Sequence, residues 1–385
     1  MKRASVGRAE LLLLSGSVGV VLLGVVAAEM ALRWIDPRRL DRREVGHEVY
    51  SEWYGWDNRP GFEGLNHDVL TTVDSRGRRS PGTVTRDSAP RPRVLMLGDS
   101  ITYGTGVRDE ETFCALMAQR YDVVNLGVEG YGTDQELLKL EREGLAYHPD
   151  VVVLNFTVAN DIWNVRSRLD DFTRLPKPYF TLVGGVPVLH REHLRHSLPG
   201  RLAQWISDYS QLYDVVRPLL PERSTPAGPE SQALSAKEGL RLTVALISRM
   251  QAVTAAAGAR FVVVVHPDEA TFKQHSSVAD SLTQRLQGAG VTVVASLADI
   301  YRGSGLGYDR IAWDYIGHLT PLGYRIAAEE IERVLESRDE RPRPASTDHG
   351  TTPSPRGTQT ERGAQGYPVR DRGDFPLRAR SSTGR

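Results

Sequence analysis

The sequence predicts an α/β protein, a three-layer α/β/α sandwich around a five-stranded parallel sheet. Five short apolar runs are continuous rather than alternating, as strands covered on both faces of a sheet should be. Helix-like segments lie between these runs, as crossovers between parallel strands require. The predicted strands are Val94–Leu97, Val123–Leu126, Val151–Phe156, Phe261–His266 and Val291–Ala295, and the predicted helices include Thr112–Arg120, Gln135–Ala146 and Ala236–Ala257.

The first predicted element is one N-terminal transmembrane helix. Residues 11–28 carry no charge, and at about 1.5 Å per residue this run is long enough to cross a bilayer. We therefore expect a short cytoplasmic N-terminus at 1–10 and a signal anchor at 11–33. The arginines that follow this run would by themselves place the main domain in the cytoplasm, but long domains can translocate despite such charges. We therefore expect a membrane-anchored protein whose main domain lies on the exoplasmic face. The alternative is secretion after cleavage near Ala28.

The remaining chain divides into four predicted parts. Residues 34–91 form a linker and a small extension with β-like runs such as Val69–Val73. Residues 92–336 form the main domain. Within it, residues 164–234 are an insertion at the ligand-binding edge, a lid or specificity element. This insertion contains a predicted hairpin over Tyr179–Leu189, which turns at two glycines. Residues 337–385 lack hydrophobic period and are predicted to be a disordered tail.

Composition excludes several classes of protein. The 385 residues include 48 Lys+Arg and 48 Asp+Glu, and zero net charge excludes an overall basic nucleic-acid binder. A single cysteine, Cys114, excludes an intramolecular disulfide framework. Three spaced histidines (His190, His193 and His196) would share a face only in a continuous helix, and prolines bracket the stretch, so we predict no metal site. We also predict no cofactor. The oligomeric state stays open.

The residues suited to chemistry follow the predicted strands. The first strand ends in Gly98-Asp99-Ser100, which places the Ser100 hydroxyl at the carboxyl edge, where such sheets bind ligands. Gly130 follows the second strand, and Asn160 follows the third. His318 lies late in the domain, and Asp314 lies four residues before it.

These residue types meet the needs of acyl transfer. Histidine, with an ordinary pKa of about 6.5, can take the proton of Ser100 near neutrality, and Asp314 would hold its tautomer. The backbone N–H groups of Ser100 and Gly130 and the amide of Asn160 would form an oxyanion hole. Losing one such donor typically costs about 3–4 kcal/mol of transition-state stabilisation.

The motifs resemble those of the SGNH (GDSL-type) hydrolases. GDSIT around Ser100, the N-x-x-x-x-G spacing of Asn125 and Gly130, the Asn160-Asp161 pair and the His318 block occur in the family's order, across most of residues 49–336. The sequence is most similar to the membrane-anchored or secreted bacterial branch. The resemblance implies a flavodoxin-like three-layer sandwich and an esterase, lipase, acetylesterase or acyltransferase that acts through a serine.

Two positions depart from the family pattern. Val158 stands where the family usually has glycine, and Tyr315 stands where it usually has the aspartate. Residues four apart share a face of a helical turn, so Asp314 could still reach His318. If Asp314 is instead a surface carboxylate, a Ser–His dyad would remain, with a backbone carbonyl orienting the ring.

Three functions are compatible with this reasoning. The first is a serine-dependent ester hydrolase that forms an acyl-enzyme on small acyl esters of glycans or lipids. The second is an O-acyltransferase that modifies envelope polysaccharide. The third is a non-catalytic glycan-binding domain, which would be favoured if Asp314 and His318 lay more than about 5 Å from Ser100.

Overall fold

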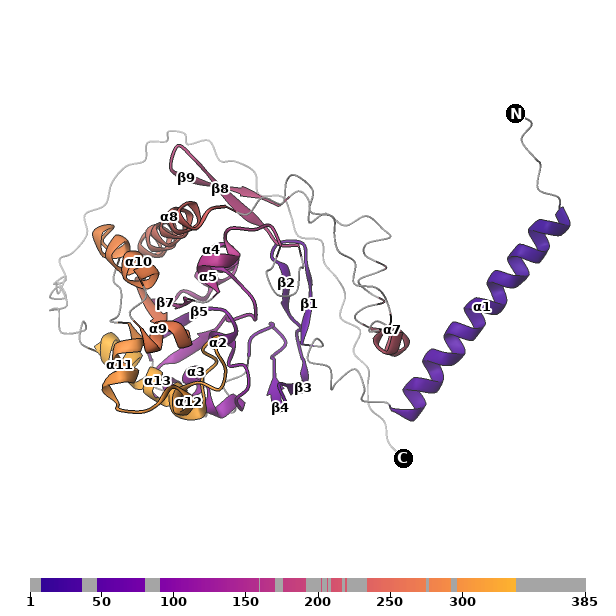
Figure 1. Cartoon of the computed structure of the whole chain (residues 1–385), viewed down its shortest axis with the longest axis horizontal. Coiled ribbons are helices and arrows are strands. Elements are labelled where there is room, and N and C mark those ends of the chain that lie inside the picture. The colour runs from indigo at the N-terminus through magenta and orange to yellow at the C-terminus, as the bar shows by residue number, and fades with distance from the viewer. Residues whose placement is uncertain are drawn as a thin grey trace, which may run out of the picture. The chain divides into compact units, whose positions relative to one another are not determined.

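A four-stranded parallel sheet lies at the centre of the fold (Figure 1). The structure is a computed structural model that describes residues 8–36, 47–79, 91–158, 160–169, 176–191, 234–274, 277–291 and 296–336, with scattered positions between 202 and 219. In spatial order the strands are β10 (Arg260–His266), β7 (Val151–Thr157), β5 (Arg93–Gly98) and β6 (Asp122–Asn125).

Four of the five predicted strands are confirmed, and the five-stranded sheet is corrected to four strands within the described residues. The fifth run, Val291–Ala295, lies outside the described residues apart from Val291, which is buried. Apolar character predicts burial, but a strand also needs a hydrogen-bonded ladder to a neighbour. No such ladder continues the sheet beyond β10 in the described part of the chain.

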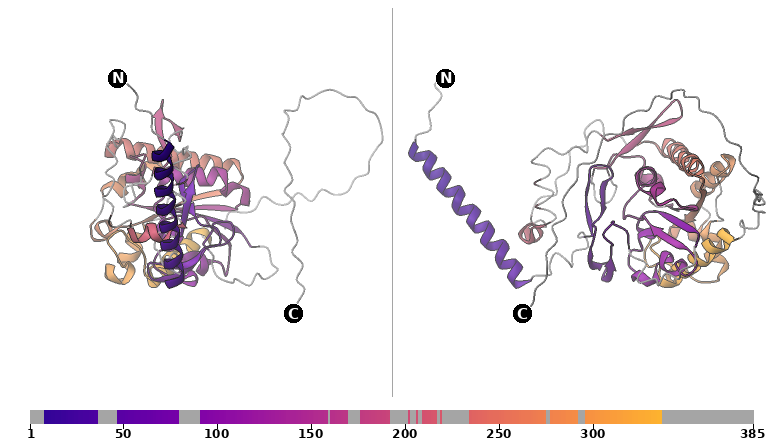
Figure 2. Two further views of the ribbon diagram at one scale, coloured as in Figure 1. Left: turned by 90° about the vertical axis from the view of Figure 1, so that its right-hand side faces the viewer. Right: turned by 180° about the vertical axis from the view of Figure 1, so that it is seen from behind.

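Helices cover both faces of the sheet, as predicted (Figures 1 and 2). One layer contains α4 (Thr133–Arg142), α8 (Ala236–Ala256) and α10 (Ser277–Gly288). The other contains α3 (Phe113–Met117), α11 (Leu297–Gly303) and α13 (Pro321–Glu336). Alternate residues of β5 point to opposite faces of the sheet. Leu95 and Leu97 belong to the hydrophobic core on one face, and Val94 and Met96 belong to the core on the other. The continuous apolar run follows from this double burial.

Short elements occupy the connections. They are α2 (Ser100–Tyr103) after β5, α5 (Asp161–Asn164) after β7, α9 (Glu269–Lys273) after β10, α12 (Tyr308–Ile311), and 3-10 turns at Asp109–Glu111 and Gly144–Tyr147. Three of these helices therefore begin at the carboxyl edge of the sheet. The order of strands reverses around β5, so this edge is where a crevice for ligands is expected.

The N-terminal extension consists of two hairpins. Strands β1 (Glu48–Ser51) and β2 (Gly55–Asn58) pair antiparallel, as do β3 (Glu63–Asn66) and β4 (Val69–Thr72). Tyr54 and Trp56 belong to the first core cluster, and the Tyr131 hydroxyl donates to the Trp56 carbonyl at 2.7 Å. The extension is thus packed against the main domain.

The predicted hairpin of the insertion is confirmed as β8 (Tyr179–Val183) and β9 (Val186–His190). Its turn residues Gly184 and Gly185 have φ of 60° and 85°, which glycine adopts at little cost. Just before β8, Lys177 pairs with Asp134 of α4, and both side chains are fully buried. This ion pair fastens the start of the hairpin to α4.

Helix α1 (Arg8–Ile35) covers the segment that was predicted to span a membrane. Within the described residues, however, no helix combines the length and the apolar character needed to cross a bilayer, so the transmembrane helix predicted at 11–33 is not found. The end of α1 is charged: Glu29 pairs with Arg33 at 2.7 Å and accepts backbone N–H groups at the start of α7 (Gln211–Val216). The predicted tail, residues 337–385, lies outside the described residues.

We predict that Lys177→Met destabilises the protein strongly, because it leaves the Asp134 carboxylate buried without a partner. Removing one member of a buried pair typically costs about 3–5 kcal/mol of unfolding free energy, measurable by urea denaturation. Burial already raises the pKa of Asp134 against the effect of Lys177, so the loss should shrink at acidic pH, where the carboxyl is neutral. The matched control is Lys273→Met, whose exposed pair with Glu269 should cost less than about 1 kcal/mol. Equal, small losses of unfolding free energy in both variants would contradict the role of Lys177 as the partner of a buried carboxylate.

Candidate active site

The position of Ser100 is set by the turn that ends β5. Gly98 has φ of 152°, and a Cβ there would lie 2.8 Å from the Asn155 carbonyl oxygen, so a larger residue does not fit. Asp99 then caps α2, its Oδ1 accepting the N–H of Ile101 at 3.0 Å. Ser100 therefore begins a helical turn at the carboxyl edge of the central strand, with its side chain partly exposed.

The structure brings Ser100, His318 and Asp314 together. Ser100 Oγ lies 2.8 Å from His318 Nε2, and His318 Nδ1 lies 2.5 Å from Asp314 Oδ2. An ionised carboxylate only accepts hydrogen bonds, so Nδ1 carries the proton and donates to Asp314. Nε2 is then left with a lone pair that accepts from the Ser100 hydroxyl. A base is thus held in contact with a potential nucleophile.

The spacing of Asp314 and His318 is accommodated by a closed loop rather than by the helical turn we expected. Asp314 Oδ1 accepts the backbone N–H groups of Ile316, Gly317 and His318 at 3.0–3.1 Å. Gly317 has φ of 111°, a conformation that favours glycine. The loop folds back on Asp314, which returns its carboxylate to the imidazole, and Tyr315 is left 68% exposed. The aspartate is therefore in reach although it stands one residue early.

The two partners shift each other's pKa in opposite directions. Burial alone would lower the pKa of His318, but the hydrogen bond and charge of Asp314 outweigh it and raise the pKa above its ordinary 6.5. Burial alone would raise the pKa of Asp314, but hydrogen bonds from His318 and from the loop lower it below its ordinary 3.8. Asp314 is therefore ionised wherever His318 titrates.

The three predicted oxyanion donors differ in whether their N–H groups are already engaged in hydrogen bonds. Within the described residues, no hydrogen bond engages the backbone N–H of Ser100 or of Gly130, and Gly130 has φ of 70°. Asn160 Nδ2, in contrast, donates to Asp99 Oδ2 at 3.0 Å and to the Tyr131 carbonyl at 2.8 Å. Both of its N–H groups are engaged, so Asn160 holds two loops together here and could serve an oxyanion only by releasing a partner.

Two aromatic neighbours of His318 were missed from the sequence. The Trp313 ring stacks on the imidazole at 5.1 Å and 17°, while 44% of Trp313 stays exposed. The His67 ring lies 5.5 Å from Trp313 and 6.4 Å from His318. The position of Trp313 beside Asp314 is a signal that could have been used. Nothing near His67 in the sequence points to this site.

Glu129, which precedes Gly130, was also missed. It accepts from Asn66 Nδ2 at 3.0 Å, accepts from the Thr105 hydroxyl, and pairs with His47 Nε2 at 2.9 Å. Burial alone would raise the pKa of Glu129, but His47 and these donors lower it well below the ordinary value. Glu129 thus ties the loop of Gly130 to the N-terminal extension.

His47, Glu48 and Glu129 are the described residues that place three potential metal ligands within 4.8 Å of one another. The ion pair between His47 and Glu129 accounts for their proximity without an ion. His266, another buried histidine, has its pKa lowered to about 3 by burial and lies 3.1 Å from Asn155 Oδ1. It is therefore neutral and is not positioned as a base for Ser100.

Three carboxyl groups near the candidate site, those of Asp99, Glu136 and Asp161, are buried. Burial raises the pKa of Asp99. Burial raises the pKa of Asp161 and of Glu136 well above their ordinary values, and neighbouring carboxylates, Asp99 among them, raise both further. Asp161 Oδ2 accepts the N–H of Thr157 at 2.6 Å and so fixes the end of β7. The neutral forms of Asp161 and Glu136 are favoured, which limits the cost of burying several acids together.

A model of the GDSL-like lipase/acylhydrolase family matches residues 96–326, a range that holds Ser100, Gly130, Asn160, Asp314 and His318. No curated protein matches the sequence.

The solved structures that match this chain have low sequence identity to it. An α/β hydrolase enzyme, LAE5, from the metagenome of Lake Arreo, Spain, is 14% identical, with 64% of this chain and 96% of that chain covered and a TM-score of 0.38. An acetyl xylan esterase, AlAXEase, is 14% identical, with 63% and 99% covered and a TM-score of 0.36. The acetylxylan esterase Axe2 from Geobacillus stearothermophilus is 15% identical, with 63% and 93% covered and a TM-score of 0.37.

We predict that Asp314→Asn lowers the pKa of His318, because the hydrogen bond and charge of Asp314 then no longer oppose burial, and only the charges of Asp99 and Glu129 still do. The titration is followed by NMR of the imidazole nitrogens. Asp309→Asn is the control, since Asp309 is exposed and should leave the midpoint unchanged. An unaltered midpoint in Asp314→Asn would show that another charge governs His318.

Proposed function

The chain belongs to the GDSL-like lipase/acylhydrolase family, and from that membership we propose that it is a serine-dependent ester hydrolase that works through an acyl-enzyme. The observation that carries the proposal is the hydrogen-bonded chain from Ser100 through His318 to Asp314, at 2.8 and 2.5 Å. A hydroxyl is a weak nucleophile until a base takes its proton, and this arrangement supplies the base in the correct tautomer.

In the acylation step, Ser100 Oγ bonds to the carbonyl carbon of the ester while its proton passes to His318 Nε2. The carbonyl oxygen becomes an anion, which the backbone N–H groups of Ser100 and Gly130 are suited to stabilise. Asp314 stabilises the imidazolium. The intermediate then collapses: the bond from carbon to the alcohol oxygen breaks, and His318 gives its proton to the leaving alcohol.

In the deacylation step, water replaces the alcohol. His318 takes a proton from the water as its oxygen bonds to the acyl carbon, and the same donors stabilise the second oxyanion. Cleavage of the bond to Ser100 Oγ releases the carboxylic acid, and His318 returns the proton to Ser100. Atoms and charge balance with no further reactant.

Small acyl esters of glycans or lipids are the proposed substrates, since the reaction needs an acyl ester and the family hydrolyses acyl groups. A purely glycan-binding role is disfavoured, because His318 lies within hydrogen-bond distance of Ser100. An O-acyltransferase would share the acyl-enzyme and differ in the acceptor. Product analysis with an acetyl donor and a glycan acceptor together distinguishes free acetate from an acylated glycan.

We expect Ser100→Ala to lower turnover of 4-nitrophenyl acetate by at least about 10⁴-fold, because the nucleophile is removed. Labelling by a fluorophosphonate should disappear in the same variant. Ser248→Ala is the matched control: Ser248 lies on α8, where it donates to the Val244 carbonyl, and should keep both signals. Undiminished turnover in a folded Ser100→Ala variant would remove Ser100 from the role of nucleophile.

The pH dependence of kcat/KM should report His318. The base must be neutral to accept the proton of Ser100, and its pKa is raised, so kcat/KM should rise with pH through an apparent pKa above 6.5. The same raised pKa means that protonation of His318 stabilises the fold at acidic pH and that this contribution is lost as pH rises through the folded pKa. An acidic limb centred at or below 6.5 would contradict the assignment.

A further inference from the structure

The N-terminal extension is fastened to the loops that carry the catalytic groups. Asn66 of β3 donates to Glu129, beside Gly130, and Asn58 of β2 donates to the Gly127 carbonyl at 2.9 Å. Trp56 Nε1 donates to the Glu129 carbonyl at 2.8 Å. The loop that follows β6 is thus held by three side chains from outside the range that the family model matches.

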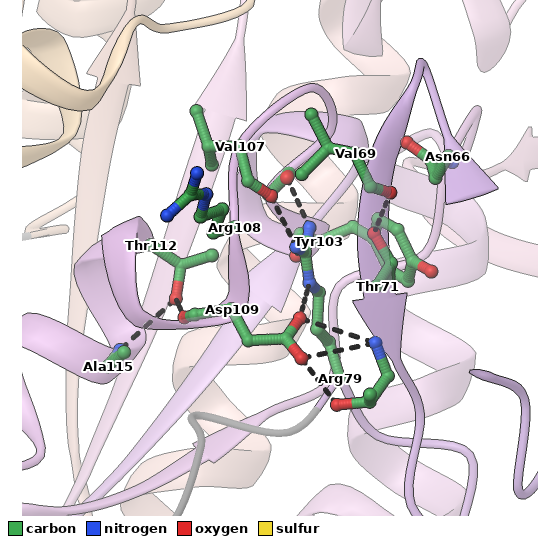
Figure 3. A network of polar contacts seen from close by, with 12 residues as sticks. Asn66, Val69, Thr71, Arg79, Tyr103, Val107, Arg108, Asp109, Thr112 and Ala115 are labelled. Carbon is green, nitrogen blue, oxygen red and sulfur yellow. Dashed lines mark hydrogen bonds and ion pairs between the residues drawn. The ribbon is translucent and has the colours of Figure 1, made fainter. Parts of the chain in front are cut away.

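A buried arginine makes the second connection (Figure 3). Arg79, 1% exposed, donates to Asp109 at 2.8 Å. It also donates to the carbonyls of Tyr103, the last residue of α2, and of Gly104 and Val107, which follow that helix. Asp109 in turn accepts the N–H of Thr72 in β4 at 3.2 Å. The β3–β4 hairpin is therefore fixed against the segment that carries Ser100.

The tip of this hairpin has an uncommon backbone. His67 and Asp68 have φ of 46° and 61°, so two consecutive non-glycine residues adopt the left-handed conformation. Hairpins with this turn usually place Asn or Gly there, because side chains with a Cβ pay a penalty of about 1 kcal/mol or more. Such strain persists where the surroundings hold it, and the anchors at Asn66 and Thr72 do so.

The turn brings the exposed His67 ring to the catalytic base. His67 contacts Trp313, which stacks on His318, so the three rings form a continuous row. In acyl transfer the histidine returns its proton to the leaving alcohol, and the alcohol must lie beside the imidazole. Groups that flank His318 therefore face the alcohol part of the ester rather than its acyl part.

We propose that His67 and Trp313 form a subsite for the alcohol part of the substrate, with His67 as a specificity-determining residue supplied by the N-terminal extension; the proposal rests on the esterase function above. The chemistry of the two side chains points to a ring that bears hydroxyls, such as a pyranose. An indole offers an apolar face, and an imidazole offers a donor and an acceptor to hydroxyls.

The test compares two acetyl esters that share an acyl group and differ in the alcohol: a monoacetylated methyl xylopyranoside and ethyl acetate. His67→Ala should lower kcat/KM for the sugar ester by about tenfold and change it less than about twofold for ethyl acetate. Asp68→Ala is the matched control, since Asp68 shares the turn and its left-handed backbone, and it should change neither value. His67→Asn keeps a residue suited to this backbone and should behave as His67→Ala does.

A second readout separates a subsite from a general structural effect. The alcohol has left before deacylation, so the deacylation rate constant, measured after the burst with 4-nitrophenyl acetate, should be the same in His67→Ala and in the wild type. An equal loss on both acetyl esters, or slowed deacylation, would overturn the subsite while leaving the esterase function intact. Wild-type enzyme that hydrolyses ethyl acetate and ignores the sugar ester would overturn the pyranose class. If a fluorophosphonate failed to label the wild-type enzyme, that result would instead refute the esterase function itself, and with it the subsite.

Discussion

The candidate site depends on one hydrogen-bonded chain, in which a carboxylate fixes an imidazole that in turn contacts a serine hydroxyl. Its members lie near the two ends of the main domain in sequence, so two separate turns must position them. Gly98 ends the central strand sharply enough to present Ser100, and Gly317 closes the loop that returns Asp314 to His318. Neither turn would keep its shape with a bulkier residue, since both positions lack space for a Cβ and both have positive φ.

Buried polar contacts keep these turns in place. Asn160 binds the carboxylate beside Ser100 and the carbonyl after Gly130, so it joins the ends of three strands. Glu129 extends the same support to the N-terminal hairpins through Asn66 and His47. Buried groups of this kind are costly when unpaired, and their mutual satisfaction therefore favours a single arrangement of the loops. The low exposure of His318, 7%, is a consequence of that arrangement.

The sequence allowed the layered architecture, four strands and the positions of Ser100 and His318 to be predicted, because continuous apolar runs and local motifs encode them. The geometry of Asp314 was harder, since it depends on three backbone N–H groups turning back onto one carboxylate oxygen. Both N–H groups of Asn160 are hydrogen-bonded, and His67 lies near His318, because segments far apart in the sequence come into contact. No local sequence pattern predicts such contacts. The fifth strand and the membrane span were inferred from apolar runs of suitable length. Composition reports a preference for burial and does not identify what covers a segment.

Arg79 has a consequence for how this protein can be recombined with its relatives. One guanidinium donates to three carbonyls that lie inside the range that the family model matches, so a crossover placed at the start of that range would separate the donor from its acceptors. In a chimera built in this way, these carbonyl oxygens near Ser100 would lose the buried donor that they have here. The hairpins and the family-matched range therefore have to be exchanged, or inherited, together.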